Sequence, residues 1–264
     1  MAKRLGINPS LFAQPLFHLL TQGDDALRDF LVSEDIPAQL AIRLREKSLD
    51  AAFLSPIDYA RDYAMYVVLP GFCVAAEHRS LSAVIIFKEN LRKISTLAVS
   101  PSSSSEIVLA TIMCAERFDG MPTLIPFRGT VDDGLGKADA VLCTGDQVLA
   151  ENGRPAQLDL VEEWSDITDL PFVHGVWVTR RHGLTGHDVD ALTEVSRRCI
   201  RTFRPDDEHR EYFQNFRYEL DERPQSGLNE FFRMAYYYGI LGDLPDLRYV
   251  SFEDDRSAFP GGSS

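Results

Sequence analysis

Residues 159–181, DLVEEWSDITDLPFVHGVWVTRR, constrain the fold of this chain more than any other stretch. An acidic amphipathic segment leads into Leu170-Pro171, and an almost wholly apolar run follows directly. Just upstream, residues 142–149 read LCTGDQVL, so that an apolar run ends at Gly145-Asp146, a pair suited to a tight turn. A helix that stops at a proline before a buried strand is typical of chains in which helices and strands alternate.

The same alternation runs along most of the chain and predicts an α/β fold. Residues 4–8 open it as a short strand, and Pro15 stands where a helix can begin, because its fixed φ and missing N–H are tolerated in a first turn. A helix from Ile36 and a strand over residues 51–54 complete a βαβ opening. The further predicted strands are 65–69, 72–76, 81–87, 96–99, 138–143 and 173–178, and the further predicted helices are 106–118, 188–203, 207–215 and 227–241.

The order of these elements predicts two lobes joined by two crossings. Charged residues at 88–93 interrupt the alternation, and we place the first crossing there. The chain returns through 173–178, so we expect lobe I to contain residues 1–90 and 176–264, and lobe II to contain residues 91–175. The tail from about Asp243 mixes Pro and Asp and closes with PGGSS, which predicts a loosely docked or disordered extension.

Charge and hydropathy exclude several classes of partner. The 264 residues are 45% hydrophobic, which allows a sizeable core, and 27 Lys+Arg against 40 Asp+Glu give a formal net charge of -13. Such a field repels nucleic acid and anionic membranes, so an anionic ligand needs local donors. The first residues, MAKRLGINPS, contain no apolar leader segment, and no run approaches the roughly 20 apolar residues of a membrane span. We therefore expect a cytoplasmic protein.

Cysteines and histidines show no metal-binding or redox spacing. Without a CxxC or HExxH arrangement, we expect four reduced, buried cysteines and no metal site. Ser-His-Asp sets, P-loops and GxGxxG fingerprints are also missing from the sequence. The cysteines are Cys73, Cys114, Cys143 and Cys199.

Several segments in order along the chain resemble one family. To the two blocks above, the chain adds RLGINPSLFAQPL at 4–16, EDIPAQLAIRLREKSLDAAFLSPIDYA at 34–60, VSPSSSSEIVL at 99–109, and the C-terminal segments 215–222 and 227–241. Together they resemble the chorismate dehydratase family of the futalosine menaquinone-biosynthesis pathway. The resemblance implies a two-lobed periplasmic-binding-protein-like fold of type 2.

The resemblance also implies a reaction. Chorismate dehydratase removes water from chorismate to give 3-[(1-carboxyvinyl)oxy]benzoate, and the stability of the aromatic ring drives the step. The enzyme chiefly has to hold two carboxylates, orient the leaving hydroxyl and exclude water, so the resemblance implies neither a metal nor an organic cofactor. The expected partner is a small aromatic or pre-aromatic carboxylate, bound by a monomer or a homodimer.

The segment PSSSSE at 101–106 is the strongest candidate for ligand binding. Ser103 and Glu106 have the S-x-x-E spacing of a capping box at a helix start. Free N–H groups there, together with the serine hydroxyls, favour a substrate carboxylate; the alternative is an ordinary capping box on a surface turn. The Glu106 charge opposes an anion. The candidate donors are Ser102, Ser103, Ser104 and Ser105.

The loop at 8–14 is the second candidate, because open α/β sheets bind ligands where strands end. Counting back from Pro15 puts Phe12 at the position where the resemblance implies an Asn central to dehydration, and a phenyl ring neither forms a hydrogen bond nor moves a proton. Asn8 is read as a strand-end amide rather than a replacement. Either the catalytic role has moved, or the protein is a non-catalytic or redirected binder of a small aromatic acid. The expected lining residues are Pro9, Ser10, Phe12, Ala13 and Gln14.

Four isolated side chains complete the candidates. Asp146 would contact ligand hydroxyls or else bond backbone near it. His174 would act as an acid or base, or else pack among aromatic residues. Arg79 and Arg128 would supply positive charge, or else lie solvated at the surface.

Overall fold

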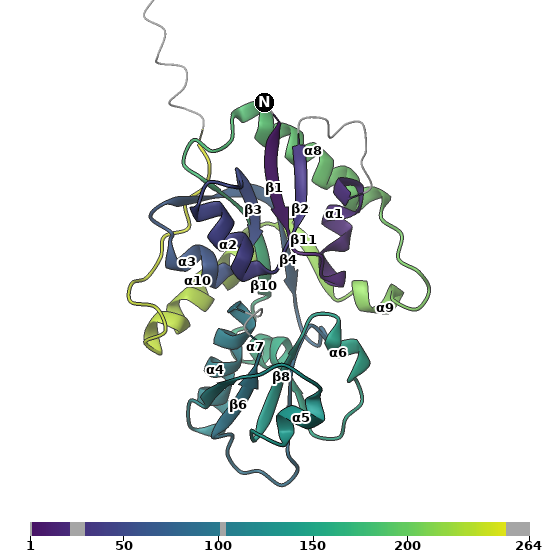
Figure 1. The fold of residues 1–264 in the computed structure, drawn as a ribbon, viewed down its shortest axis with the longest axis vertical. Helices are drawn as coiled ribbons and strands as arrows, with labels where there is room; N and C mark the ends of the chain where they lie inside the picture. The colour runs from purple at the N-terminus through teal and green to yellow at the C-terminus, as the bar shows by residue number, and fades with distance from the viewer. Residues whose placement is uncertain (1, 22–29, 101–103, 252–264) are drawn as a thin grey trace, which may run out of the picture.

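The computed structural model describes residues 2–21, 30–100 and 104–251, and these form two lobes stacked along the long axis (Figure 1). One lobe is built on a six-stranded sheet with the order β11-β4-β10-β3-β1-β2, and the other on a five-stranded sheet with the order β7-β6-β8-β5-β9. The predicted two-lobed α/β architecture is therefore confirmed. Among the described residues, no helix combines the length and the apolar character that a bilayer crossing requires.

The larger sheet is mixed, and its centre is apolar on both faces. β1 pairs in parallel with β2 and β3, whereas β10 runs antiparallel to both β3 and β4. Strands buried on both faces read as continuous apolar runs, which is why β3 and β10 were predictable. The strands are β1 (Lys3–Ile7), β2 (Phe30–Glu34), β3 (Ala51–Leu54), β4 (Tyr66–Ala76), β10 (Phe172–Arg180) and β11 (Phe216–Leu220).

Helices cover this sheet. The helices that follow β1 and β3, which are α1 and α3, begin at the end of the sheet that faces the second lobe (Figure 1). Pro37 opens α2 and Pro56 opens α3, in both cases at a position where a missing N–H costs nothing. The elements are the 3-10 helix η1 (Leu11–Ala13), α1 (Gln14–Thr21), α2 (Pro37–Arg45), α3 (Pro56–Arg61), α8 (Gly186–Thr202), α9 (Arg210–Phe213) and α10 (Glu222–Tyr237).

The smaller lobe repeats this construction around β8 and β6. Its longest helix, α4 (Ser104–Phe118), packs on α7 (Leu160–Thr168) and also reaches α3 and α10 of the larger lobe. One hydrophobic cluster consequently runs through both lobes on this side. The remaining elements are β5 (Ala83–Phe87), β6 (Thr96–Val99), β7 (Thr123–Pro126), β8 (Ala140–Thr144), β9 (Gln157–Asp159), α5 (Val131–Leu135) and α6 (Gln147–Ala150).

Both crossings between the lobes come earlier in the chain than we predicted. β5 belongs to the smaller sheet, where it pairs with β8 and β9, so the first crossing joins Ala76 to Ala83 rather than following Phe87. The charged residues 88–93 instead form a largely exposed turn between β5 and β6. β10 is already part of the larger sheet from Phe172, so the second crossing precedes residue 176.

Two local predictions also need correction. The pair Pro70-Gly71 does not separate two strands but lies inside β4, where Gly71 has a φ of +101° and the register against β10 shifts. Such a bulge admits a proline without ending the strand. The described part of the tail, which ends at Ser251, is not loosely docked, because Val250 N donates to Val68 O of β4 at 3.0 Å. Residues 252–264 lie outside the described part of the chain.

Candidate functional site

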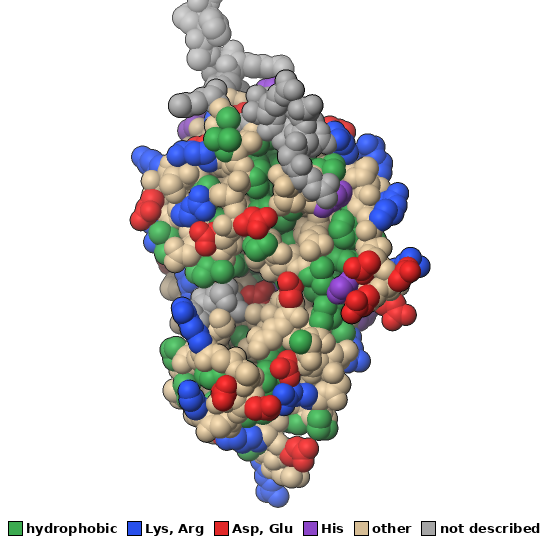
Figure 2. Space-filling view, turned by 45° about the vertical axis from the view of Figure 1, so that its right-hand side comes forward, with side chains coloured by type: hydrophobic (Ala, Val, Ile, Leu, Met, Phe, Trp, Pro, Cys, Tyr) green, Lys and Arg blue, Asp and Glu red, His purple; other side chains and the backbone are tan. Residues whose placement is uncertain are grey.

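A cavity of about 250 Å³ lies at the junction of the lobes. The carboxyl ends of β1, β3 and β8 meet there, together with the start of β10 and the first turn of α4, which is where open α/β sheets place ligands. Figure 2 shows the surface hollowed at this junction, with acidic side chains in view. The described lining residues are Asn8, Pro9, Ser10, Phe12, Ile36, Pro37, Ser55, Glu106, Thr144, Gly145, Asp146 and His174.

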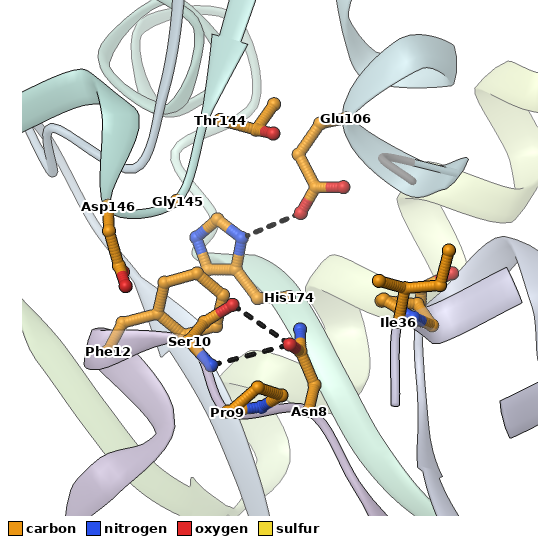
Figure 3. Close-up of a pocket in the computed structure, with 12 residues that line it drawn as sticks. Asn8, Pro9, Ser10, Phe12, Ile36, Glu106, Thr144, Gly145, Asp146 and His174 are labelled. Carbon is orange, nitrogen blue, oxygen red and sulfur yellow. Dashed lines mark hydrogen bonds and ion pairs between the residues drawn. The ribbon is translucent and has the colours of Figure 1, made fainter. Parts of the chain in front are cut away.

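The loop after β1 forms one wall of the cavity, and Ser10 and Phe12 are among its lining residues. Asn8 Oδ1 accepts hydrogen bonds from Ser10 N at 3.3 Å and from Ser10 Oγ at 3.0 Å, so the Asn8 side chain holds the turn (Figure 3). Ala13 is fully buried in the core, and Gln14 lines a neighbouring cavity of about 370 Å³. Neither Ala13 nor Gln14 is among the residues that line the cavity at the junction.

Phe12 packs inward rather than presenting its face to solvent. Its side chain is 6% exposed and stacks on the His174 ring, with centroids 4.9 Å apart, and on Phe216 at 5.7 Å. The Tyr218 hydroxyl donates to Phe12 O at 3.1 Å and fixes the backbone. Phe12 therefore positions the His174 ring and contributes an apolar edge to the cavity.

The His174 ring is packed among aromatic residues, which is one of the two alternatives that the sequence left open, and its role as an acid or base stays a prediction. Its side chain has no exposed surface, and Phe172 meets its ring edge-to-face at 5.0 Å. Both ring nitrogens are bonded at the same time. Nδ1 lies 3.2 Å from Glu106 Oε1 (Figure 3), and Nε2 lies 3.0 Å from Ser82 Oγ. The imidazole is therefore packed among aromatic rings and also paired with a carboxylate in the cavity.

Glu106 was not predicted as a site residue, although it lies in the first turn of α4 and faces the cavity. Its side chain is 12% exposed and spans from the smaller lobe to β10 of the larger lobe. The only signal in the sequence was the position of Glu106 at a helix start, which indicated a cap. Because its partner His174 lies 68 residues further along the chain, the pairing could not be read from local spacing.

The serine segment has a different role where the structure describes it. Ser105 is buried, and its Oγ accepts a hydrogen bond from Ile57 N at 3.0 Å, so it caps the start of α3 in the other lobe. Ser104 lines a separate pocket with Arg61 and Ile107. Successive residues of a helix point about 100° apart, which sends the Ser105 and Glu106 side chains in different directions. Ser102 and Ser103 lie outside the described residues.

Asp146 lies at the rim, on the turn after β8 that Gly145 makes with a φ of +60°. Its Oδ1 accepts a hydrogen bond from Leu11 N at 2.9 Å, which joins the two lobes across the cleft. The carboxylate therefore bonds a backbone N–H group, which is one of the two alternatives, but this group belongs to a loop that is distant in the sequence rather than to the neighbouring backbone.

The described lining of the cavity carries two carboxylates and one imidazole, and no Lys or Arg. Arg79 donates to Asn152 Oδ1 at 3.1 Å, and Arg128 is exposed beyond β7, so neither arginine lines the cavity. Behind Ser55, burial raises the pKa of Asp58, although Ser55 Oγ donates to this carboxylate at 2.8 Å. An anionic ligand would thus depend on backbone N–H groups, hydroxyls and amides.

Comparison with known proteins gives one family and one fold. A family model described as menaquinone biosynthesis matches residues 3–237. A chorismate dehydratase from Thermus thermophilus is 27% identical over 256 residues, covering 86% of this chain and 93% of the relative. Among solved structures, protein AF1704 from Archaeoglobus fulgidus has a TM-score of 0.67 at 18% identity, covering 90% of this chain and 98% of that one.

Other similar structures include the periplasmic aliphatic sulphonate binding protein SsuA from Escherichia coli. Its TM-score is 0.60 at 14% identity, with 93% of this chain and 95% of that one covered. A Candida albicans protein described as having the generic periplasmic binding protein fold reaches a TM-score of 0.59 at 13% identity, with coverage of 97% and 99%. At these identities the likeness shows the fold alone, which is the periplasmic-binding-protein-like fold expected from the sequence.

Proposed function

This chain belongs to the menaquinone biosynthesis family, and we propose that it is a chorismate dehydratase-like lyase that removes water from chorismate to give 3-[(1-carboxyvinyl)oxy]benzoate. The observation that carries the proposal is the extent of the family match. Residues 3–237 include both lobes, so every described residue that lines the cavity falls within the match.

The cavity suits the size of such a substrate. At about 250 Å³ it lies just below the range of roughly 300–1,000 Å³ that holds drug-sized ligands, so a single-ring acid is an appropriate occupant. Walls from two lobes allow the ligand to be enclosed and bulk water to be excluded, which is the main demand of an elimination that ends in an aromatic ring.

The lining also predicts how this member differs from its relatives. Phe12 stands at the position expected for an Asn, and no described lining residue is Lys or Arg, so we expect weak binding of a dianion and a high KM. The Asn8 amide and the Ser10 hydroxyl are the polar groups of the β1 wall. Because Asn8 Oδ1 already accepts from Ser10 Oγ, we expect the N–H groups of the Asn8 amide to orient the ligand.

Incubation of the purified protein with chorismate, followed by chromatography of the aromatic product, tests this function. We expect product to form faster than with heat-denatured protein. Asn8→Leu, which fills the cavity wall, should lower the rate at least tenfold, whereas Asn152→Leu, on the exposed α6 side of the smaller lobe, should leave it unchanged. Thermal stabilisation by chorismate without product would support a binder instead, and neither effect would reject chorismate as the ligand.

A further inference from the structure

Glu106 and His174 come from opposite lobes and meet at the inner end of the cavity. Glu106 lies on α4, whereas His174 lies on β10, and their side chains approach to 3.2 Å. Glu106 presents 12% of its side chain to the cavity, while the imidazole is covered by the Phe12 ring. A partly exposed carboxylate backed by a buried, aligned imidazole is an arrangement suited to proton transfer.

The imidazole is itself held in place from behind. Its Nε2 bonds Ser82 Oγ at 3.0 Å, and Ser82 Oγ lies 2.6 Å from Ser80 Oγ. The backbone N–H groups of Ser80 and Leu81 donate to Asp159 Oδ2 at 3.1 and 2.7 Å. The first crossing between the lobes is therefore clamped by a carboxylate, and this fixes the orientation of the ring that aligns Glu106.

We propose that Glu106 is the proton-transferring catalytic residue of this site and that His174 is its positioning residue. This inference rests on the proposed lyase function. It assigns to α4 and β10 the role that Phe12 cannot take in the β1 loop. Glu106 is a better candidate than Asp146, because Asp146 is exposed at the rim and accepts its bond from Leu11 N.

The step balances without a further reactant. A Glu106 carboxylate oxygen removes the proton from the ring carbon that bears the enolpyruvyl ether, and the electrons of that C–H bond form the new ring double bond. The neighbouring C–O bond breaks, and the departing hydroxide takes the proton back from Glu106 as water. In chorismate the ether and the hydroxyl lie on opposite ring faces, so this hydrogen and the leaving hydroxyl share one face. One carboxylate can therefore serve both.

Glu106→Gln tests the proton transfer, because the amide keeps the shape but accepts no proton. We expect kcat to fall by about 10²–10⁴-fold, while KM for chorismate changes by less than about threefold. Glu162→Gln, an exposed carboxylate on α7, is the matched control and should keep kcat. A kcat within about threefold of the wild type, or a loss expressed only in KM, would overturn the assignment while leaving the lyase function intact. Absence of product from the wild type would instead reject the lyase function itself.

His174 is tested by a pair of substitutions that separate alignment from packing. His174→Asn keeps an N–H donor close to the Nδ1 position, whereas His174→Phe keeps an aromatic ring without a donor. We expect His174→Asn to retain at least tenfold more kcat than His174→Phe. If Glu106→Gln fails to fold, Glu106→Asp replaces it, with an expected 10–100-fold lower kcat at unchanged melting temperature. Equal kcat in the two His174 variants would contradict the positioning role.

Discussion

The lobes are joined across the cleft at two places that differ in construction. At the inner end, Glu106 meets the shielded His174 ring, with Ser82 behind it. At the rim, the exposed Asp146 accepts one bond from Leu11 N. A buried polar group that loses its partner costs about 1–3 kcal/mol, whereas an exposed hydrogen bond of the ordinary kind contributes about 0.5–1.5 kcal/mol. The inner contact therefore fixes the two lobes, and the rim can open at small cost.

The inner side is also where other contacts between the lobes gather. The Ile57 N–H donates to Ser105 Oγ, and the Tyr238 hydroxyl donates to Glu116 Oε1 at 2.5 Å. Together with the shared hydrophobic cluster, these contacts pack α4 of the smaller lobe against α3 and α10 of the larger lobe without a break, and we call this the crossing side. Motion that admits a ligand is then expected to pivot there and to separate Asp146 from Leu11.

Asp159→Ala should have the largest effect on stability. Asp159 caps α7 through Val161 N at 2.9 Å and Glu162 N at 3.2 Å, and it also accepts the two N–H groups of the first crossing. Loss of a cap costs about 0.5–2 kcal/mol and an unpaired buried donor about 1–3 kcal/mol, so we expect a loss of about 2–4 kcal/mol in urea denaturation.

Asp221→Ala is the control for this substitution. Asp221 caps α10 through Arg223 N at 3.1 Å, but its side chain is 46% exposed and does not hold a crossing. We expect a loss of about 1 kcal/mol. If the two variants were equally stable, the crossing would contribute nothing beyond an ordinary helix cap.

Gly227→Ala addresses the second crossing. A Cβ at Gly227 would lie 2.1 Å from Pro171 O, so α10 would have to move away from the backbone that leads into β10. Overpacking of this kind costs about 1–3 kcal/mol. Gly242→Ala is the matched control, because nothing lies within 4 Å of its Cβ, and it should stay within about 0.5 kcal/mol. Similar urea midpoints for both variants would show that α10 does not brace this crossing.

Asp58→Asn reports on burial behind the inner contact. Burial raises the pKa of Asp58, against the Ser55 hydroxyl and the Arg61 guanidinium, which favour the charged form. A raised pKa in the folded state means that the folded protein holds the proton longer. Its stability should therefore fall, relative to the Asp58→Asn variant, as pH rises from about 3.9 through the raised value, with a slope of at most about 1.4 kcal/mol per pH unit.

Urea denaturation of both proteins at constant ionic strength between pH 4 and 7 measures this difference. Arg61 is half exposed, so its ion pair with Asp58 opposes the effect of burial on the Asp58 pKa only weakly. A wild type that gains stability over the variant with rising pH would show that the hydroxyl and guanidinium outweigh burial.

The sequence predicted the fold where burial is continuous and failed where it is not. β3 and β10 are buried almost along their length and were found as apolar runs. β7 is mostly exposed and β9 has three residues, so neither leaves a periodic signal. The lobe boundary was misplaced because charge marked an exposed turn, whereas the membership of β5 depends on pairing with distant strands.

The position of the site could be predicted from the sequence, but the hydrogen bonds between its side chains could not. Strand ends indicated Ser10 and Asp146, and the returning strand indicated His174; the structure places all three in the lining of the cavity. The partner of each carboxylate depends on how the lobes meet, since Asp146 bonds a residue 135 positions away. Local spacing carries no information about such contacts, and Glu106 was therefore taken for a cap.

Asp146→Ala should have the smallest effect and tests the rim directly. The bond to Leu11 N is solvent-exposed, so we expect a loss of about 1 kcal/mol or less in the free energy of unfolding. Asp132→Ala is the control, because it removes an exposed carboxylate that pairs with Arg154 within the smaller lobe. Hydrogen exchange separates the two variants, because only Asp146→Ala frees the Leu11 amide, whose exchange should become several-fold faster while the amides of β10 keep their protection. A loss as large as that of Asp159→Ala, or faster exchange throughout β10, would mean that the rim and the inner contact form one cooperative unit and that the cleft does not open by a pivot on its crossing side.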